Sequence, residues 1–464
     1  MWTLGRLAEE LETTVEGNPE TVISGVREDS RACAPGELFL AVRGTDDDGL
    51  HYARDAIQRG AVAVASERDP GAGVPWLRVP DARAAAGRLA DLLYGDPSRQ
   101  LALIGVTGTN GKTTTAHLVT QLLPGPVGFI GTTGIDWPGR VGGRTASLNT
   151  TPSPTTLRRY LRAMVDEGCI ACVMEVSSHA LAQARTDGLH FAAAIYTNLS
   201  GDHLDYHGTM EAYANAKARL FTGLESSAHA IFNATDPACA RIETRARVHW
   251  FRPEEVRVTR DGTRFRWRDR DAELPFVGRH NAENAAAALE AVTALGADPD
   301  ESLAAMRGAT SARGRLEIVA TDPVLVLVDY AHTDDALLQA IRATREVTEG
   351  KVIVVFGCGG DRDRSKRPRM GAVAAQWADR VYVTNDNPRT EDPARIASEI
   401  VAGTGNAGAT VVLDRREAIR TALRHARPGD SVLIAGKGHE SYQIVGDRRL
   451  DFDDVAVARE EYPR

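Results

Sequence analysis

The stretch from residue 101 to residue 119, LALIGVTGTNGKTTTAHLV, constrains the fold of this chain more than any other. Its apolar start, residues 101–106, predicts a buried strand, and a turn rich in Gly and Asn then leads into a helix that begins near Lys112. Such a turn between a strand and a helix is typical of a phosphate-binding loop, because backbone N–H groups and the helix N-terminus face the anion. The stretch therefore predicts a nucleoside triphosphate as a ligand.

The residue types in this loop suit a triphosphate. We expect Gly108 and Gly111 to let the backbone approach the phosphates, Lys112 to reach the outer phosphates, and the Thr113 hydroxyl to hold Mg²⁺. The residues expected around this triphosphate are Gly108, Thr109, Asn110, Gly111, Lys112, Thr113 and Thr114. Because Val stands at position 106, the generic spacing is not met, and an incidental glycine-rich turn is the alternative interpretation.

Length and charge narrow the class of protein. A chain of 464 residues is too long for one hydrophobic core and suggests about three domains. The net charge of −8 gives no reason to expect a nucleic-acid surface. The start of the chain is acidic rather than signal-like, and no apolar run approaches the roughly 18 residues of a membrane span. We therefore expect a cytoplasmic protein with no membrane partner.

The five cysteines form no disulfide framework. Cys169 and Cys172 make a C-x-x-C pair, but they lie in the apolar run CIACVME. A buried strand is favoured over a metal or redox site, because no second cysteine pair completes a zinc site.

Lysine is rare in this chain, and its positions are informative. Only five of the 55 basic residues are lysines, at positions 112, 217, 351, 366 and 437. A chain that otherwise uses arginine keeps lysine where a compact ammonium or a nucleophilic amine is needed. Four of the five lie in polar or glycine-rich motifs, whereas Lys351 merely opens a predicted strand. The alternative interpretation is that the five lysines are scattered by chance and have no special role.

Strand, helix and turn signals divide the chain into three units, residues 1–98, 99–311 and 312–464. The first contains a turn, strand, loop and helix and ends at the turn-rich YGDPSRQ. The other two alternate apolar runs with helical or polar stretches, which predicts mostly parallel sheets covered by helices. We therefore expect an α/β fold with a smaller N-terminal domain, a central ATPase-type domain and a C-terminal Rossmann-like domain. The sequence GCGGDRD lacks the dinucleotide fingerprint, so NAD is not expected.

Polar residues follow two predicted strands of the central unit. Glu175 follows CIACVM and His203 follows AAAIYTNLS, at the carboxyl edge where parallel sheets bind ligands. We expect Glu175 and Thr113 to be the first pair of Mg²⁺ ligands and His203 to contact a second metal. A capping role is the alternative for Glu175.

Four motifs together resemble the Mur ligase family, in particular its MurE class. They are VTGTNGKTTT at residues 106–115, EVSSH at 175–179, TNLSGDHLDYHG at 197–208 and ANAKARLF at 214–221. The resemblance implies that Lys217 carries a carbamate, as N6-carboxylysine, which acts as an anionic ligand beside Mg²⁺. The chemistry suits lysine, since a neutral amine takes up CO₂ and a guanidinium does not. An ordinary surface lysine in the run MEAYANAKARLF is the alternative.

The resemblance extends over nearly the whole chain and implies further binding residues. The substrate implied for the central domain is UDP-N-acetylmuramoyl-L-alanyl-D-glutamate, and the N-terminal domain would hold its uridine near Ser30 and the loop at Thr45 and Asp46. Other positions matching the family around this substrate are Thr150, Thr151, Ser177, Gln183 and Arg185. Positions matching its nucleotide side are Asn281, Arg315 and Asp329.

The sequence DNPR at residues 386–389 indicates which amino acid is added. Arg389 offers a planar fork for a carboxylate, and diaminopimelate carries a second carboxylate that lysine lacks. The motif matches the diaminopimelate-adding MurE class. The expected pocket consists of Arg362, Asp386, Asn387, Pro388, Arg389, Gly436 and Glu440. An ordinary surface role for Arg389 is the alternative.

These observations predict an ATP-dependent amide ligase that works as a monomer through an acyl phosphate, with Lys112, Glu175, His203 and Lys217 as its catalytic residues. A folylpolyglutamate synthetase is a second possibility, although its substrate is not a uridine nucleotide. A ligase outside cell-wall synthesis and a catalytically silent, nucleotide-binding paralogue are two others. The sequence does not choose between the meso and LL isomers of diaminopimelate.

Overall fold

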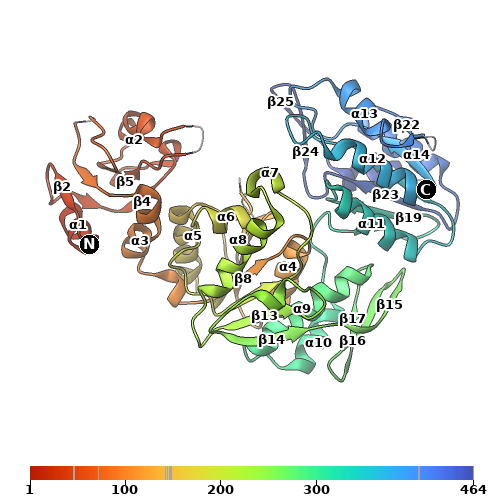
Figure 1. The fold of residues 1–464 in the computed structure, drawn as a ribbon, viewed down its shortest axis with the longest axis horizontal. Coiled ribbons are helices and arrows are strands. Elements are labelled where there is room, and N and C mark those ends of the chain that lie inside the picture. Colours follow the sequence, from red (N-terminus) through yellow and green to blue (C-terminus); the bar gives the residue numbers. More distant parts are fainter. Residues whose placement is uncertain are drawn as a thin grey trace. The chain divides into compact units, whose positions relative to one another are not determined.

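The computed structural model describes residues 1–44, 47–71, 73–141, 143, 145, 149–405 and 408–462. The chain forms two compact units. The first comprises Met1–Trp250 with Glu290–Ala297, and the second comprises Phe251–Leu289 with Asp298–Arg464. Figure 1 labels the helices and strands.

A five-stranded sheet opens the first unit, in the order β2-β7-β6-β5-β4. Strands β4 to β7 are parallel and β2 is antiparallel to β7. The strands of this sheet are β2 Thr14–Glu16, β4 Gly25–Arg27, β5 Glu37–Leu40, β6 Ala63–Ser66 and β7 Trp76–Arg78, while β1 Trp2–Thr3 and β3 Val22–Ile23 pair in a separate two-stranded antiparallel sheet. The helices are α1 Leu4–Glu10, α2 Ala53–Gln58 and α3 Ala82–Tyr94, with short turns η1 Ser30–Ala32, η2 Gly49–Tyr52 and η3 Pro97–Arg99.

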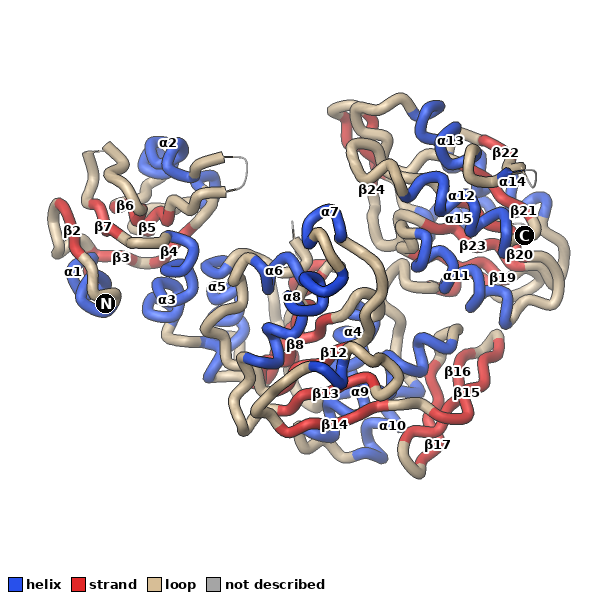
Figure 2. Tube along the Cα trace, in the orientation of Figure 1, coloured by secondary structure: helices blue, strands red, loops and turns tan. Residues whose placement is uncertain are grey.

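A seven-stranded sheet follows, in the order β10-β9-β11-β8-β12-β13-β14. Its strands are β8 Ala102–Thr107, β9 Val127–Gly131, β10 Gly134–Asp136, β11 Ala171–Glu175, β12 Ala193–Tyr196, β13 His229–Asn233 and β14 Arg247–Phe251. The intervening helices are α4 Lys112–Leu122, α5 Pro154–Asp166, α6 Ser178–Ala182, α7 Leu204–His207 and α8 Met210–Thr222, with the turn η4 Cys239–Arg241. The strands lie side by side between helices in Figure 2.

Strand β8 occupies the centre of this sheet, parallel to β11 on one side and β12 on the other. The register places Glu175 opposite Val106 and Tyr196 opposite Thr107. The three strands therefore end at the same edge, where the predicted phosphate loop begins.

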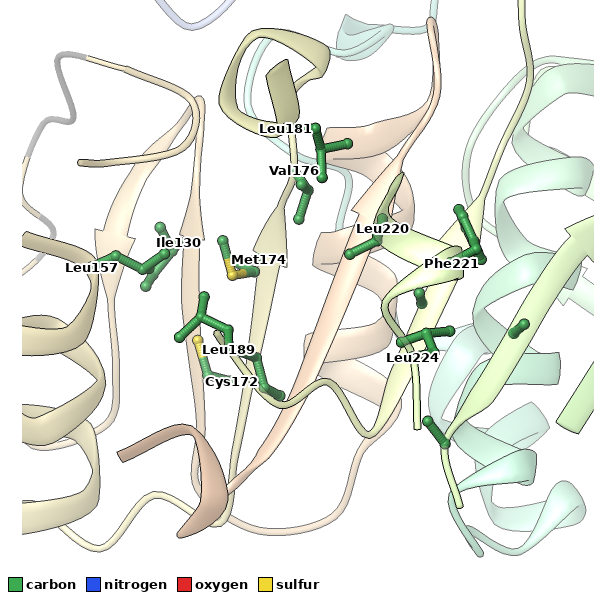
Figure 3. Packing of buried hydrophobic residues seen from close by; sticks show 14 of the residues in the cluster. Ile130, Leu157, Cys172, Met174, Val176, Leu181, Leu189, Leu220, Phe221 and Leu224 are labelled. Atoms are coloured by element: carbon green, nitrogen blue, oxygen red, sulfur yellow. The ribbon is translucent and has the colours of Figure 1, made fainter. Parts of the chain in front are cut away.

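Helices α5 and α8 pack against the buried side chains of this sheet. Leu157 from α5, Met174 from β11 and Phe221 from α8 belong to one buried cluster (Figure 3). Cys169 and Cys172 are buried and free, with Cys172 inside β11. The interpretation of the C-x-x-C pair as part of a buried strand region is thus confirmed.

The second unit starts with a three-stranded antiparallel sheet that the sequence analysis did not identify. Its strands are β15 Glu254–Thr259, β16 Gly262–Trp267 and β17 Arg270–Leu274, followed by α9 Arg279–Ala294 and α10 Pro299–Arg307. Along β16 the buried side chains of Phe265 and Trp267 alternate with the arginines at 264 and 266. The high charge of the segment concealed this alternation.

A six-stranded sheet forms the rest of the second unit, in the order β18-β19-β23-β20-β21-β22. All its strands are parallel except β18. They are β18 Glu317–Ala320, β19 Leu325–Asp329, β20 Val352–Phe356, β21 Arg380–Val383, β22 Thr410–Val411 and β23 Ser431–Ala435. The helices are α11 Asp334–Glu346, α12 Lys366–Trp377, α13 Pro393–Val401, α14 Arg415–His425 and α15 Asp454–Glu461, and β24 Tyr442–Val445 pairs with β25 Arg448–Asp451.

The predicted α/β class is confirmed, and the mostly parallel sheet expected for the C-terminal region is present, although its strand β22 has only two residues. The predicted domain limits at 98 and 311 stay a prediction. The loop at Thr45 and Asp46 lies outside the described residues. Within the described ranges, no helix is both long and apolar enough to cross a membrane.

Candidate active site

The predicted phosphate loop connects β8 to α4 and depends on two glycines with positive φ. Gly108 has φ 143° and Gly111, which caps α4, has φ 83°. A Cβ atom at Gly108 would lie 1.9 Å from Thr197 Oγ1, so no side chain fits there. The conformation of the loop at these two positions therefore requires glycine.

The segment after β12 holds this loop in place. The backbone N–H of Thr109 donates to Asn198 O at 2.8 Å, and that of Asn110 donates to Asn198 Oδ1 at 2.9 Å. Thr197 Oγ1 donates to Asn110 O at 2.6 Å. The sequence analysis assigned no role to Thr197 or Asn198, although the TNLS motif immediately after the β12 run could have indicated one.

Lys112 lies at the first turn of α4. Its Nζ donates to Gly108 O at 2.9 Å and to Thr109 O at 2.8 Å, so the ammonium lies over the loop. Thr114, two residues further along α4, is buried.

Glu175, at the end of β11, is fully buried. Its carboxylate accepts from Thr113 Oγ1 at 2.9 Å and from the backbone N–H of Thr132 at 2.8 Å. A hydroxyl and a carboxylate in contact form an all-oxygen donor set, which suits Mg²⁺. No cluster of three or more His, Cys, Asp or Glu side chains that could hold a metal occurs among the described residues. The donor set therefore fits an ion that keeps phosphate and water as most of its ligands.

Lys217 on α8 is buried, with 1% of its surface exposed. Its Nζ donates to Gly108 O at 2.8 Å and lies 4.3 Å from the centre of the Tyr213 ring. Burial, together with the charge of Lys112, holds the pKa of this amine well below its usual value. The alternative of an ordinary surface lysine is therefore wrong.

His203 lies at the N-terminus of α7 with φ 53°. Its ring lies 3.4 Å from Asp202 and its side chain is 45% exposed. Burial lowers its pKa despite Asp202, and the charges of Lys112 and Lys217 act in the same direction. His203, Lys112 and Lys217 thus lie within electrostatic range of one another.

Five predicted substrate residues come together beside Glu175. Thr151 Oγ1 donates to Glu175 O at 2.8 Å and accepts from the N–H of Ser177 at 3.0 Å. Arg185 Nη1 donates to Thr151 O at 2.8 Å, and Arg185 Nη2 donates to Gln183 Oε1 at 2.7 Å. Thr150 Oγ1 lies 3.1 Å from the hydroxyl of Thr132. Ser30 is apart from this group, buried in η1 beside the five-stranded sheet.

The predicted nucleotide-side residues of the second unit lie in two places. Asn281 is buried on α9 and donates to Val277 O at 2.8 Å. Asp329 ends β19 and accepts from the N–H groups of Leu316 and Ala331. Burial raises the pKa of Asp329 while Arg315, whose guanidinium lies over the Tyr330 ring, opposes this shift.

Most of the residues predicted for the amino-acid pocket lie after the ends of β21 and β23. Asn387 Nδ2 donates to Glu440 Oε2 at 2.8 Å, and the fully buried Lys437 donates to Glu440 Oε2 at 3.3 Å and to Asn387 Oδ1 at 3.2 Å. Asp386 lies 3.7 Å from the same ammonium. Lys437 was noticed only as one of the rare lysines, and the structure places it at the centre of this network.

Arg389 has φ 52° and is held by its backbone to the β24 strand, with its N–H donating to Ile444 O at 3.0 Å. Its Nη1 donates to Gly360 O at 2.7 Å. Arg362 is exposed in the adjacent loop, Pro388 is buried, and Gly436 has φ 114° with a Cβ position 2.9 Å from Asp386 Oδ2. No ion pair joins Arg389 to a carboxylate in the described part of the chain.

Family models match this chain in three segments. The Mur ligase family catalytic domain matches residues 22–94, the Mur ligase middle domain residues 106–292, and the Mur ligase glutamate ligase domain residues 314–438. A curated relative from Gloeobacter violaceus, UDP-N-acetylmuramoyl-L-alanyl-D-glutamate--2,6-diaminopimelate ligase, is 44% identical over 95% of this chain and 94% of its own. The chain belongs to the Mur ligase family.

Other similarities agree with this Mur ligase assignment. A ligase of the same name from Geobacillus thermodenitrificans is 43% identical over 96% of this chain and 95% of its own. A solved structure with that name is 32% identical, with a TM-score of 0.68, and the match covers 99% of this chain and 98% of the other. The folylpolyglutamate synthase of Mycobacterium tuberculosis complexed with ADP and AMPPCP shares the fold, with a TM-score of 0.63 and 20% identity over 76% of this Mur ligase and 92% of its own chain.

Proposed function

We propose that this Mur ligase joins diaminopimelate to UDP-N-acetylmuramoyl-L-alanyl-D-glutamate at the expense of ATP, in the synthesis of peptidoglycan precursors. The observation that carries the proposal is the 44% identity to a ligase of that name over 95% of the chain. The phosphate loop and the DNPR pocket support it. The folylpolyglutamate alternative has weaker support, with 20% identity over 76% of the chain.

The reaction has two steps. The γ-carboxylate of the D-glutamate attacks the γ-phosphorus of ATP, which forms an acyl phosphate and releases ADP. The amine of diaminopimelate then attacks the acyl carbon, which forms the amide and releases phosphate and a proton. Positioning and charge neutralisation supply most of the catalysis in such chemistry. In this assignment Gly108 to Thr114 bind the phosphates of ATP, and Lys112 neutralises their charge. Asn281, Arg315 and Asp329 are the further residues assigned to the nucleotide.

Thr113 and Glu175 would hold Mg²⁺, and the bound ion would neutralise charge on the transferred phosphoryl group. Their 2.9 Å contact supports this assignment. We propose His203 for a second metal, supported by its position after β12, the strand beside β8 whose end carries the phosphate loop.

We propose that Lys217 is carboxylated. Its neutral amine adds to CO₂, forming an N–C bond and releasing one proton, and the product is an anionic carbamate. The lowered pKa of Lys217 supports the proposal because only the unprotonated amine reacts with CO₂. The resulting negative charge would offset the nearby Lys112 ammonium.

Two substrate sites complete the proposal. Thr150, Thr151, Ser177, Gln183 and Arg185 would bind the muramoyl peptide, and Ser30 would lie near the uridine. Arg389 and Arg362 would meet the distal carboxylate of diaminopimelate, and Glu440, Asp386 and Asn387 its distal ammonium, with Pro388 and Gly436 shaping the pocket. The closed network around Lys437 supports a prepared polar site here.

We propose that the enzyme acts as a monomer in the cytoplasm. Its five free, buried cysteines suit a reducing compartment. Sedimentation of the purified protein at micromolar concentration checks the monomer.

Product analysis tests the proposed function. The protein is incubated with the uridine dipeptide, ATP, Mg²⁺ and one amino acid at a time, and the products are weighed by mass spectrometry. We expect a product heavier by diaminopimelate minus water, with equal amounts of ADP and phosphate. A product formed only with another amino acid, or no product from the uridine nucleotide, contradicts the proposal.

A further inference from the structure

A fully buried ion pair lies next to the strand ends that precede the proposed amino-acid pocket. Arg415 is the first residue of α14 and Asp454 the first residue of α15, and neither side chain is exposed. Arg415 Nε donates to Asp454 Oδ1 at 2.7 Å and Arg415 Nη2 donates to Asp454 Oδ2 at 2.6 Å. This two-point contact fixes the plane of the guanidinium.

The same guanidinium contacts the ends of two strands. Arg415 Nη1 donates to Asn385 O at 3.2 Å, and Arg415 Nη2 donates to Ala435 O at 3.0 Å. Asn385 directly precedes Asp386, and Ala435 directly precedes Gly436. The Arg415 side chain therefore binds the backbone directly before each of the two segments, starting at Asp386 and at Gly436, that form the proposed pocket.

The sheet alone does not join these two strand ends. Strand β20 lies between β21 and β23, so no ladder hydrogen bond connects them directly. The space at the end of β20 is narrow, since a Cβ atom at Gly357 would lie 2.1 Å from Thr384 O. Arg415 provides a direct link between the β21 and β23 ends.

The charge of Arg415 also reaches the pocket. Although burial opposes it, the carboxylates of Asp454, Asp386 and Glu440 raise the pKa of Arg415. The guanidinium is thus permanently charged, and the Asp454 carboxylate in contact with it offsets that charge. An arginine is needed because lysine has no planar fork that reaches a carboxylate and two carbonyls together.

We propose that Arg415, oriented by Asp454, is a positioning residue for the amino-acid substrate. It sets the distance between Asp386–Asn387 and Gly436–Glu440, and so the fit of the pocket to diaminopimelate. The proposal rests on the proposed ligase function for its substrate, but the geometry it describes is independent of that function.

Replacing Arg415 and Asp454 together separates an effect on substrate positioning from an effect on the stability of the fold. Replacing both partners of a buried ion pair by apolar residues is often neutral for stability, whereas replacing one leaves a buried charge. The test variant is therefore Arg415→Met with Asp454→Leu, checked by its Tm. The matched control is Arg420→Met, which removes another contact between α14 and α15, to Glu461 at 2.8 Å, without touching the strand ends.

Steady-state kinetics gives the first readout. We expect the double variant to raise the KM for diaminopimelate about tenfold or more while the KM for ATP changes less than about twofold, because only the amino-acid site is disturbed. Arg420→Met should resemble the parent. An unchanged KM for diaminopimelate, or an equal rise for every substrate, overturns the proposal.

Hydrogen exchange gives a second readout that needs no turnover. The amides of Gly436, Arg389 and Glu440 donate backbone hydrogen bonds at the pocket and should exchange faster in the double variant. The amide of Val176, which donates to Val106 O, should not change. If the parent makes no product with diaminopimelate, the proposed function fails, and unchanged exchange at the three pocket amides still overturns this inference. If the double variant does not fold, Arg415→Lys is measured in the same two ways.

Discussion

Lys217 Nζ donates a hydrogen bond to the carbonyl oxygen of Gly108 at 2.8 Å, although 109 positions separate the two residues in the chain. This contact brings a buried amine against the phosphate loop. Burial and the positive charge of Lys112 lower the pKa of the Lys217 amine. Whether the Lys217 amine is neutral, protonated or carboxylated therefore changes the net charge beside the phosphate loop.

We predict that Lys217→Ala loses nearly all ligase activity and recovers partly in acetate, since a small carboxylate then occupies the vacated anionic position. Lys217→Arg should not recover, because its side chain fills the space with the wrong charge. Product formation with and without acetate measures the effect. Parental activity in the Arg variant would show that no carbamate is needed.

We predict that Lys112→Ala lowers turnover by on the order of 10²-fold or more, because a charge that stabilises the phosphoryl transfer is lost. The fold should be kept, since Lys112 lies at the start of α4 outside the buried apolar clusters and its ammonium contacts the carbonyls of Gly108 and Thr109. Turnover and Tm are compared with those of Lys351→Ala, an exposed lysine before β20. Near-parental turnover in Lys112→Ala would sink this assignment.

Glu175→Gln should raise the Mg²⁺ concentration needed for half-maximal activity about tenfold or more, because the side chain keeps its shape and loses its charge. Magnesium titrations of the ligation rate measure this shift. The control is Glu167→Gln, an exposed carboxylate after α5. Equal magnesium dependence in parent and Glu175→Gln would remove Glu175 from the metal site.

Arg389 should decide between diaminopimelate and lysine. Lysine leaves the guanidinium without its distal carboxylate, a penalty of roughly 2 to 5 kcal/mol and hence a preference well over tenfold. Arg389→Ala should erase most of this preference, and Arg389→Lys, which keeps the charge without the fork, should fall between. The ratio of kcat/KM for the two amino acids is the measurement, and a ratio of one in the parent contradicts the assignment.

His439 should make the protein less stable in acid. Burial lowers its pKa to about 4 from the usual 6.5, helped by the positive charges of Arg315, Arg313, His332 and Lys437. Between these two values the unfolded chain binds more protons than the folded chain, so stability falls as the pH falls from about 6.5 towards about 4. The Tm of His439→Gln should fall less steeply than that of the parent over this range. Parallel curves would exclude His439 as a contributor.

Local patterns in the sequence predicted much of the fold and part of the site. The apolar runs before Gly108, Glu175 and Asp386 all lie in or contain strands, because a strand buried on both faces needs continuous apolar residues. Parallel strands end at one edge, so the polar residues that follow them were predicted to meet, and the contact of Thr113 with Glu175 agrees. The strands β15 to β17 were missed because arginines interrupt their apolar residues.

The sequence by itself determined the strand-turn-helix loop at residues 101–119, the α/β class and the rarity of lysine, since each is a local or compositional property. Only the tertiary structure decided that Lys217 is buried against Gly108, that Thr197 and Asn198 hold the loop, and that Lys437 and Arg415 connect the ends of β21 and β23. These contacts join residues far apart in the chain. Their partners depend on strand order and register, which arise from packing the whole sheet and which no short pattern records.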